Sequence, residues 1–151
     1  MGEDALLLKH FFNDSERWAC ANDGRPCTHT YLELGANDGE SMSNTLAFHH
    51  HLGWRGVLVE ASPRYCPDLQ RRRCRDVVAC GAVCSKNFGG QIDIVENGAV
   101  SAAVGMGSTQ AFVSKWLRAN KRDASNSSIT VPCAPLSDIL GRRSMLKVAA
   151  L

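Results

Sequence analysis

The sequence lacks a long apolar run, and no segment approaches the ~18 consecutive apolar residues that a membrane-spanning helix needs. It also lacks the features of a secretory signal peptide. The amino terminus carries Glu3 and Asp4 where such a signal has basic residues, and the apolar run Leu6–Leu8 is too short. These absences predict a cytoplasmic protein without a membrane span.

A strong excess of charge of one sign is missing as well. The formal net charge is only +2 over 151 residues, which is too small to indicate a nucleic-acid partner on electrostatic grounds. The basic run Arg71–Arg73, with Arg75 close behind, is the one local exception. It could form a phosphate-binding patch, but we interpret it as a solvated helix end.

A regular cysteine framework is absent, although the chain has 7 cysteines. Their number is odd and their spacing irregular, so we expect no disulfide framework. We expect Cys80, Cys84 and Cys133 to be buried as small apolar side chains. A zinc site at Cys80 and Cys84 is the weaker alternative, because no second Cys or His pair follows at zinc-finger spacing. The run His49–His51 is interpreted as a solvated helix terminus, and no metal site is expected.

What is present is an alternation of helical and strand patterns. The first part predicts a short helix whose inward face holds Leu6, Leu7, Phe11 and, less clearly, Leu8. Strands and helices then alternate along the chain. The predicted ranges are helices at 4–12, 40–52 and 62–73, strands at 30–34, 56–60 and 76–83, and a tight loop at 35–39.

The second half is less regular. An alternating strand at 91–95 precedes Asn97-Gly98, a hairpin-type turn. A helix at 112–120, a polar loop at 120–128, a strand at 129–133 and a helix at 136–140 follow. The whole order predicts an α/β fold with a parallel sheet. We divide it into an amino-terminal helix and loop at 1–29 and a main domain at 30–151.

The most informative segment is Tyr31–Gly39, in which an apolar strand pattern runs into a Gly-x-x-x-Gly loop. Glycines at Gly35 and Gly39 allow a sharp turn and a close approach of a ligand. The dinucleotide fingerprint has a further middle glycine that admits a pyrophosphate, and here Asn37 occupies that position. Asp38 adds a negative charge there. The loop therefore favours a ligand without phosphate, and the acidic Asp38 is compatible with one that carries a positive charge.

Two acidic residues complete the pattern. Glu60 ends the next apolar strand about 20 residues after the loop, where a carboxylate accepts both hydroxyls of a ribose. Glu33 lies at the end of the first strand. Either residue alone could be an exposed strand end, but the pair at this spacing indicates a cationic nucleoside, S-adenosyl-L-methionine. An oxidoreductase that uses a nicotinamide cofactor is a weaker alternative, since the middle glycine is missing.

The segment from Tyr31 to Thr45 resembles motif I of the FkbM family of methyltransferases. Leu52–Pro63 is similar to the second strand of that family, and Val78–Ser85 to its third strand. Ser101–Gly105 and Val131–Leu140 resemble two later signatures. These collinear similarities extend from about Tyr31 to Leu140.

This resemblance implies a Rossmann-like class I methyltransferase fold and methyl transfer from S-adenosyl-L-methionine to a hydroxyl oxygen of a small molecule or glycan. It assigns a cofactor loop shaped by Glu33, Gly35 and Gly39, with Glu60 on the ribose. No catalytic residue is assigned. The full set of predicted cofactor-binding residues is Glu33, Gly35, Ala36, Asn37, Gly39, Glu60, Ala61 and Ala82.

The chain departs from the family after Leu140. The family continues into a fourth central strand with a Leu-Asp-x-Glu-Gly type segment, whereas this sequence runs Gly141–Leu151 and stops. We therefore expect the cofactor-binding half of the domain, with a sheet incomplete in its carboxyl-terminal half. An unpaired apolar sheet edge would favour aggregation or a homo-oligomer. The alternative function is a non-catalytic, methyltransferase-like interaction module.

Overall fold

A three-stranded parallel sheet forms the centre of the structure, a computed structural model that describes residues 3–12, 29–96, 101–104 and 128–141. The strands are β1 (Thr30–Leu34), β2 (Arg55–Glu60) and β3 (Val77–Cys80), in the order β1-β2-β3. Leu34 pairs with Val59, and Glu60 pairs with Cys80. The carboxyl ends of all three strands therefore lie along one edge of the sheet.

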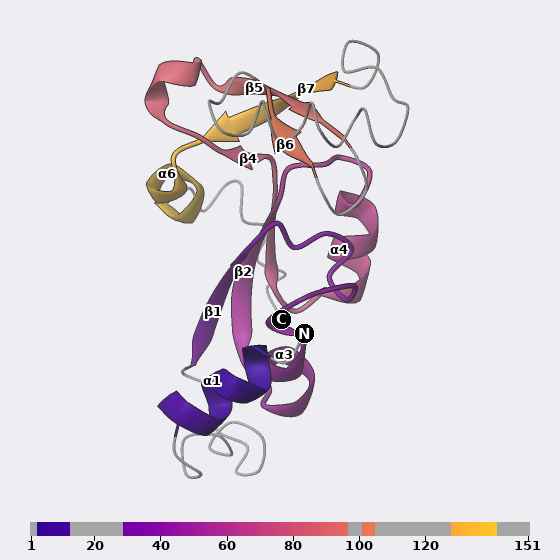
Figure 1. Ribbon diagram of the computed structural model, residues 1–151, viewed down its shortest axis with the longest axis vertical. Helices are drawn as coiled ribbons and strands as arrows, with labels where there is room; N and C mark the ends of the chain where they lie inside the picture. Colours follow the sequence, from indigo (N-terminus) through magenta and orange to yellow (C-terminus); the bar gives the residue numbers. More distant parts are fainter. Residues whose placement is uncertain (1–2, 13–28, 97–100, 105–127, 142–151) are drawn as a thin grey trace.

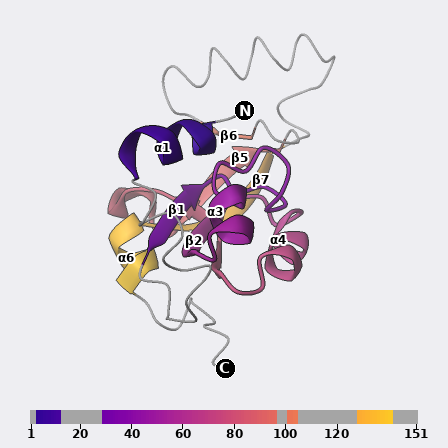
Figure 2. The same cartoon turned by 90° about the horizontal axis from the view of Figure 1, so that it is seen from below.

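The apolar run of β2 is buried because helices cover both faces of the sheet. Leu69 of α4 (Cys66–Arg72) packs with Leu58 on one face. Ile139 of α6 (Leu136–Gly141) packs with Val59 on the other. The two helices lie on opposite sides of the sheet in both Figure 1 and Figure 2. This two-sided cover is what a continuous apolar strand of a parallel sheet requires.

Two helices pack at the amino-terminal end of the sheet (Figure 1). Phe48 of α3 (Leu46–His51) forms a core cluster with Leu52, which directly follows the helix, and with Trp54. Leu8 of α1 (Glu3–Phe11) and Phe12 pack against this cluster.

The helix predicted at 4–12 is confirmed, but the prediction that Leu6 and Leu7 face inward is wrong. Leu6 and Leu7 are 59% and 40% exposed, and Leu8 is the leucine that faces the core. The side chain of Phe11 lies outside the described residues.

A second sheet lies above the carboxyl ends of β1, β2 and β3 (Figure 1). Its strands are β4 (Ala82–Val83), β5 (Gln91–Val95), β6 (Ala102–Ala103) and β7 (Ser128–Ala134), in the order β4-β7-β5-β6, and the 3₁₀ helix η1 (Lys86–Phe88) lies between β4 and β5. In this sheet β4 pairs with β7 in parallel, whereas β5 pairs with β7 and β6 in antiparallel fashion. Ile92, Ile94, Val131 and Cys133 form its buried core.

Three predicted elements differ from the structure in length. The helix expected at 40–52 begins only at Leu46, and the helix expected at 62–73 begins at Cys66. The strand expected at 76–83 is divided at Gly81, whose φ of 158° ends β3 and directs the chain into the second sheet. The predicted turn at 97–98 and helix at 112–120 lie outside the described residues. So does the polar loop predicted at 120–128, except for Ser128, which begins a strand.

The structure overturns the prediction of no disulfide framework. Cys66 is bonded to Cys80, and Cys84 is bonded to Cys133. The first bond joins α4 to the end of β3, and the second joins the segment after β4 to β7. Spacing along the chain does not reveal such pairs, because packing of distant elements brings the cysteines together. Cys80 is also exposed rather than buried.

The described residues form a mixed α/β fold with two sheets and short helices. Among them, no helix has the length and apolar character needed to cross a bilayer.

Candidate functional site

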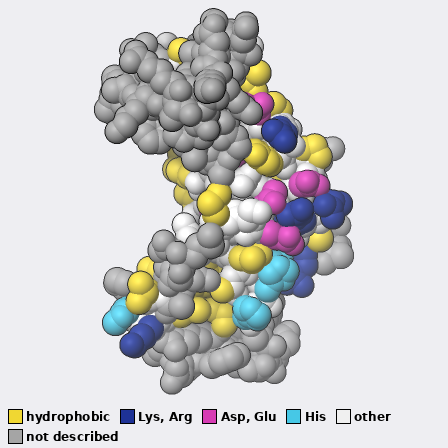
Figure 3. Space-filling view, turned by 45° about the vertical axis from the view of Figure 1, so that its right-hand side comes forward, with side chains coloured by type: hydrophobic (Ala, Val, Ile, Leu, Met, Phe, Trp, Pro, Cys, Tyr) yellow, Lys and Arg dark blue, Asp and Glu magenta, His cyan; other side chains and the backbone are white. Residues whose placement is uncertain are grey.

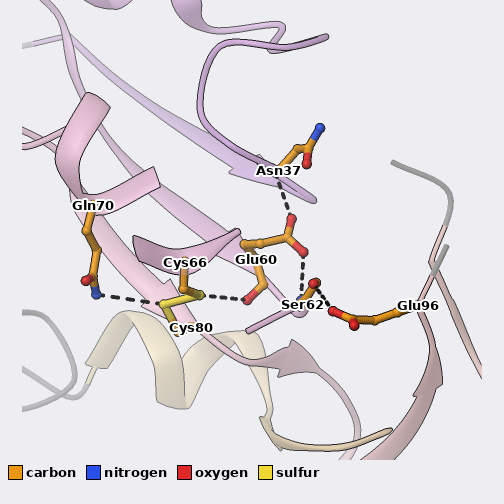
Figure 4. Close-up of a disulfide and its surroundings, with 7 residues drawn as sticks. All are labelled: Asn37, Glu60, Ser62, Cys66, Gln70, Cys80 and Glu96. Atoms are coloured by element: carbon orange, nitrogen blue, oxygen red, sulfur yellow. Dashed lines mark hydrogen bonds between the residues drawn. A yellow bond between two sulfur atoms is a disulfide. The ribbon is translucent and has the colours of Figure 1, made fainter. Parts of the chain in front are cut away.

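The carboxylate of Glu60 is held in a defined position at the carboxyl end of β2. The backbone N–H of Asn37 donates to Glu60 Oε2 at 2.7 Å, and the backbone N–H of Ser62 donates to Oε1, also at 2.7 Å (Figure 4). Glu60 is only 7% exposed. A carboxylate has about four lone-pair positions, so each oxygen keeps acceptor capacity for a further donor.

A cavity of about 220 Å³ opens beside this carboxylate. It lies between the carboxyl ends of β1 and β2 and the start of β4. Five of the eight residues predicted to bind the cofactor line it: Gly35, Asn37, Glu60, Ala61 and Ala82. The remaining lining residues are Leu34, Val59, Tyr65, Gly81, Val83 and Ser101.

The chemical character of the cavity is acceptor-rich and free of cations. Among the described residues that line it, Glu60 is the only charged side chain. Asn37 also has a buried side-chain oxygen without a hydrogen-bond partner among the described residues. Such an orphaned acceptor indicates a missing donor. The cavity thus suits a ligand that donates hydrogen bonds and carries no phosphate.

The two loop glycines have different roles. Gly35 has a φ of 77°, and its N–H donates to the Val59 carbonyl at 2.8 Å, which ties the start of the loop to β2. Gly39 has a φ of 84°, but it faces the protein interior. A Cβ there would lie 2.7 Å from Arg73 Cγ and 2.8 Å from Leu69 Cδ1. The absence of a side chain at Gly39 therefore allows close packing against Arg73 and Leu69, and its contact with a ligand stays a prediction.

Glu33 and Ala36 also lie away from the cavity. Glu33 is buried, and its carboxylate accepts hydrogen bonds from Ser43 Oγ, the Asn44 N–H and Thr45 Oγ1 at 2.9, 2.9 and 2.5 Å. It holds the chain between the loop and α3, which is why residues 40–45 do not extend the helix. Ala36 is buried in the core beneath the loop.

Asp38 likewise does not project its charge into the cavity. Its carboxylate accepts the N–H groups of Glu40 and Ser41 at 3.0 and 2.7 Å, and it pairs with Arg72 at 2.8 Å. Partial burial opposes ionisation, but these hydrogen bonds and Arg72 outweigh it and lower the pKa of Asp38 below its usual value. The charge predicted to repel phosphate is therefore already compensated.

The basic run is mixed with acidic side chains and is not a phosphate patch. Arg71 pairs with Asp68 at 2.9 Å, and Arg72 contacts Asp38 and Glu40. Figure 3 shows acidic and basic side chains together in one band of the surface. The interpretation as a solvated helix end describes Arg71 but is wrong for Arg73, which is 0% exposed.

Arg73 links the loop from Gly35 to Gly39 to the core. Its guanidinium donates to Asp76 Oδ2 at 2.8 Å, to the Gly39 carbonyl at 2.9 Å and to the Tyr31 hydroxyl at 2.7 Å. The remaining donors reach Ser43 and Thr45. Burial, together with its hydrogen bond to Asp76, raises the pKa of Tyr31 above its ordinary value. This buried network fixes the far side of the loop.

His49 belongs to the same network, contrary to the prediction that all three histidines are solvated. It is 6% exposed, and its Nδ1 lies 3.0 Å from Asp76 Oδ2. His50 and His51 are exposed. Burial lowers the pKa of His49, and the nearby Arg73 adds to this effect, whereas Asp76 opposes it. Within the described ranges, no group of three or more potential metal ligands gathers at one place.

A larger cavity of about 800 Å³ lies at the outer side of β3, next to β7 and α6. It shares Gly81 and Ala82 with the smaller cavity but does not include Glu60. Its charged lining residues are Asp76, Lys86 and Asp138. Since the oriented carboxylate and the orphaned acceptor belong to the smaller cavity, we assign the site there.

Several residues at the site are not found by reading the sequence. Tyr65 and Ser101 line the cavity, and Glu96 approaches it through Ser62. Two signals were available: Ser62 lies directly after the Glu60-Ala61 pair, and Ser101 begins a segment that resembles a later signature of the family. Ser101 and Glu96 come from the second sheet, whose position over the first cannot be inferred from local spacing.

The comparison with known families agrees with this geometry. A sequence model described as the Methyltransferase FkbM domain matches residues 33–148. No curated protein and no solved structure matches the chain.

Proposed function

The chain belongs to the FkbM family of methyltransferases, and on this premise we propose that the cavity beside Glu60 binds S-adenosyl-L-methionine for methyl transfer to a hydroxyl oxygen. The observation that carries the proposal is the Glu60 carboxylate, fixed by the N–H groups of Asn37 and Ser62 within the cavity. The proposed fold is correspondingly the Rossmann-like class I type, and its three parallel strands support this.

The residues present fit such a cofactor. Glu60 would accept the two hydroxyls of the ribose, because each of its oxygens already holds one N–H and can accept another donor. Ala61 and Ala82 would lie against the base, where small side chains leave room. Asn37 would accept a donor with its unpartnered oxygen. The absence of cations from the described lining disfavours a pyrophosphate ligand.

When bound, S-adenosyl-L-methionine supplies a methyl group on a positively charged sulfur. The described residues contribute position and exclusion of water, the two factors on which an in-line transfer depends most. Gly35 and Asn37 shape the loop, and the Arg73 network keeps it in place. A general base is needed only where the acceptor is a poor nucleophile, and no described residue is assigned that role.

A panel of ligands tests the choice of cofactor. Thermal unfolding is followed with S-adenosyl-L-methionine, S-adenosylhomocysteine and NADH, each at saturating concentration. A ligand at 100 times its Kd stabilises the folded state by about 2.7 kcal/mol, so both adenosyl compounds should raise the Tm by several degrees. Stabilisation by NADH alone would overturn the proposal in favour of a nicotinamide cofactor.

The proposed acceptor is a small molecule or a glycan with a free hydroxyl, and we propose no nucleic-acid partner. The net charge of +2 and the mixed surface charges support this view. A labelled methyl donor incubated with pools of sugars, glycans and small alcohols identifies the acceptor. Folded protein that binds the cofactor but labels no pool would favour the non-catalytic interaction module.

We also propose that β1 mediates contact with a second copy of the chain. Within the described ranges, β1 pairs only with β2, and Leu32 and Leu34 are 42% and 53% exposed. An open strand edge with apolar side chains favours such pairing. Light scattering at micromolar concentration should show an oligomer that Leu34→Lys weakens, and a monomeric wild type contradicts it.

A further inference from the structure

Ser62 is a buried residue that contacts two carboxylates at the end of β2. It is 1% exposed. Its backbone N–H donates to Glu60 Oε1 at 2.7 Å, and its hydroxyl donates to a carboxylate oxygen of Glu96 (Figure 4). Ser62 therefore connects the side chain that defines the site with an acidic residue 34 positions further along the chain.

Glu96 belongs to the second sheet, directly after β5. Among the described residues, Ser62 is the one hydrogen-bond partner of its carboxylate, and no cation is paired with it. Val95 pairs with Ala102, so the end of β5 and Ser101 lie at the same end of this sheet. Ser101 lines the cavity. Glu96 thus anchors the part of the second sheet that forms one wall of the cavity.

We propose that Ser62 and Glu96 are positioning residues that set the orientation of the Glu60 carboxylate toward a cis-diol. The hydroxyl of Ser62 fixes residue 62 against the second sheet, and this fixes the N–H that holds Glu60 Oε1. With Oε2 held separately by Asn37, both oxygens are then directed by the protein. The inference rests on the proposed function, because it concerns how the same site recognises ribose.

The arrangement makes a specific prediction about ligand chemistry. A carboxylate that is held at both oxygens can accept from two neighbouring hydroxyls at once. When one anchor loosens, the paired interaction weakens, whereas contacts elsewhere on the ligand are unchanged. The affinity for a ribose ligand should therefore fall more than the affinity for a 2′-deoxyribose analogue, which offers one hydroxyl fewer.

The experiment measures dissociation constants of S-adenosylhomocysteine and its 2′-deoxy analogue by calorimetry. Ser62→Ala removes the hydroxyl but keeps the N–H to Glu60. We expect an affinity for S-adenosylhomocysteine that is weaker by about 5- to 20-fold, the size of the net contribution of about one hydrogen bond. The analogue should lose less than 2-fold, so that the preference for the diol shrinks.

Glu96 supplies the matched variants. Glu96→Ala should reproduce the effect of Ser62→Ala, and the double variant should be no weaker than either single variant, because both remove one shared interaction. Glu96→Gln keeps an acceptor oxygen for Ser62 and should retain most of the affinity. Since Glu96 is only partly buried, its variants provide folded protein even where Ser62→Ala lowers stability.

Equal losses for both ligands, or no loss in either variant, would overturn the positioning role. A failure of the proposed function looks different, because wild-type protein would then not bind S-adenosylhomocysteine. If wild type binds, Glu60→Ala weakens binding, and Ser62→Ala and Glu96→Ala leave both constants unchanged, only the present inference fails.

Discussion

Among single residues, Arg73 has the largest structural effect on the proposed site. It is fully buried and contacts Asp76, Tyr31 and the Gly39 carbonyl through charged hydrogen bonds. Its partner Asp76 is itself 8% exposed. Removal of one member of a buried pair leaves the other charge uncompensated, which is more costly than the pair itself is favourable. Arg73 therefore couples the stability of the fold to the shape of the loop from Gly35 to Gly39.

Arg73→Met should lower the free energy of unfolding by about 3–5 kcal/mol. Urea denaturation monitored by circular dichroism measures this change. Arg71→Met is the matched control, because Arg71 is exposed and forms only a surface pair with Asp68. The control should leave the stability nearly unchanged, because an exposed ion pair contributes little. Similar values for the two variants would show that the buried network contributes little.

His49 should make stability depend on pH. Its folded-state pKa lies below the ordinary value, since burial and Arg73 disfavour the charged ring. In the unfolded chain the pKa of this histidine has its ordinary value of about 6.5. At a pH between the folded and unfolded pKa values, the unfolded chain binds more protons than the folded protein. Stability therefore falls as the pH is lowered through about 6.5. Above that pH the neutral His49 makes its full contribution to the stability of the folded protein.

The measurement is the urea midpoint between pH 5 and 8. His49→Asn keeps a donor near Asp76 without a titrating ring and should flatten the profile, whereas His50→Asn at an exposed position should not. A wild-type midpoint that stays constant from pH 8 to 5 would contradict the role of His49.

At the scale of elements, the loop from Gly35 to Thr45 depends on close packing at Gly39. Gly39→Ala should destabilise the protein by about 2–4 kcal/mol, since a positive φ disfavours a side chain and the new methyl group overlaps Arg73 and Leu69. Gly89→Ala is the control, because it measures the cost of a positive φ without the overlap of side chains. Gly89 has a φ of 65° but no atom within 4 Å of the added Cβ. Equal destabilisation in thermal melts would show that the overlap relaxes without cost.

The helices and strands also show how much of the fold can be predicted from the sequence. The strands at 30–34 and 91–95 are confirmed, because their patterns depend on neighbouring residues only. The helix expected from Glu40 is shorter, since Ser43 and Thr45 bond to Glu33 instead of extending the helical turn. Residues 40–45 favour these side-chain bonds, which periodicity alone does not reveal.

The site was predicted to a similar extent. The loop and Glu60 were found because their spacing is local, and the structure brings five of the eight predicted residues around one cavity. Their contact with a cofactor stays a prediction. Arg73, Ser62 and Glu96 were missed because their roles depend on distant partners. An arginine within a basic run has the same sequence pattern whether it is solvated or buried.

At the scale of the whole molecule, the two disulfides found among the described residues connect elements that packing brings together. They close loops of sequence separation 14 and 49, for which chain entropy predicts about 3 and 4 kcal/mol of stabilisation. We expect a dithiol reductant to lower the Tm by at least about 10 °C. Cys74→Ser, at an exposed free cysteine, should leave the Tm unchanged.

Peptide mapping after alkylation checks the pairing directly. Alkylation of Cys66 and Cys133 in unreduced protein would contradict it. The same mapping on protein taken from cells tests the cytoplasmic prediction, because cytosolic proteins keep most thiols reduced.

The measurement that tests the central claim most directly is calorimetric titration of the folded chain with S-adenosyl-L-methionine. We predict one binding site per chain for wild type and at least about 10-fold weaker binding for Glu60→Gln, because a neutral amide accepts the ribose hydroxyls less strongly. Glu40→Gln, an exposed acidic residue on the same loop but outside the cavity, should bind as wild type does. Folded wild-type protein without binding heat, or a Glu60→Gln variant that binds equally well, would contradict the account.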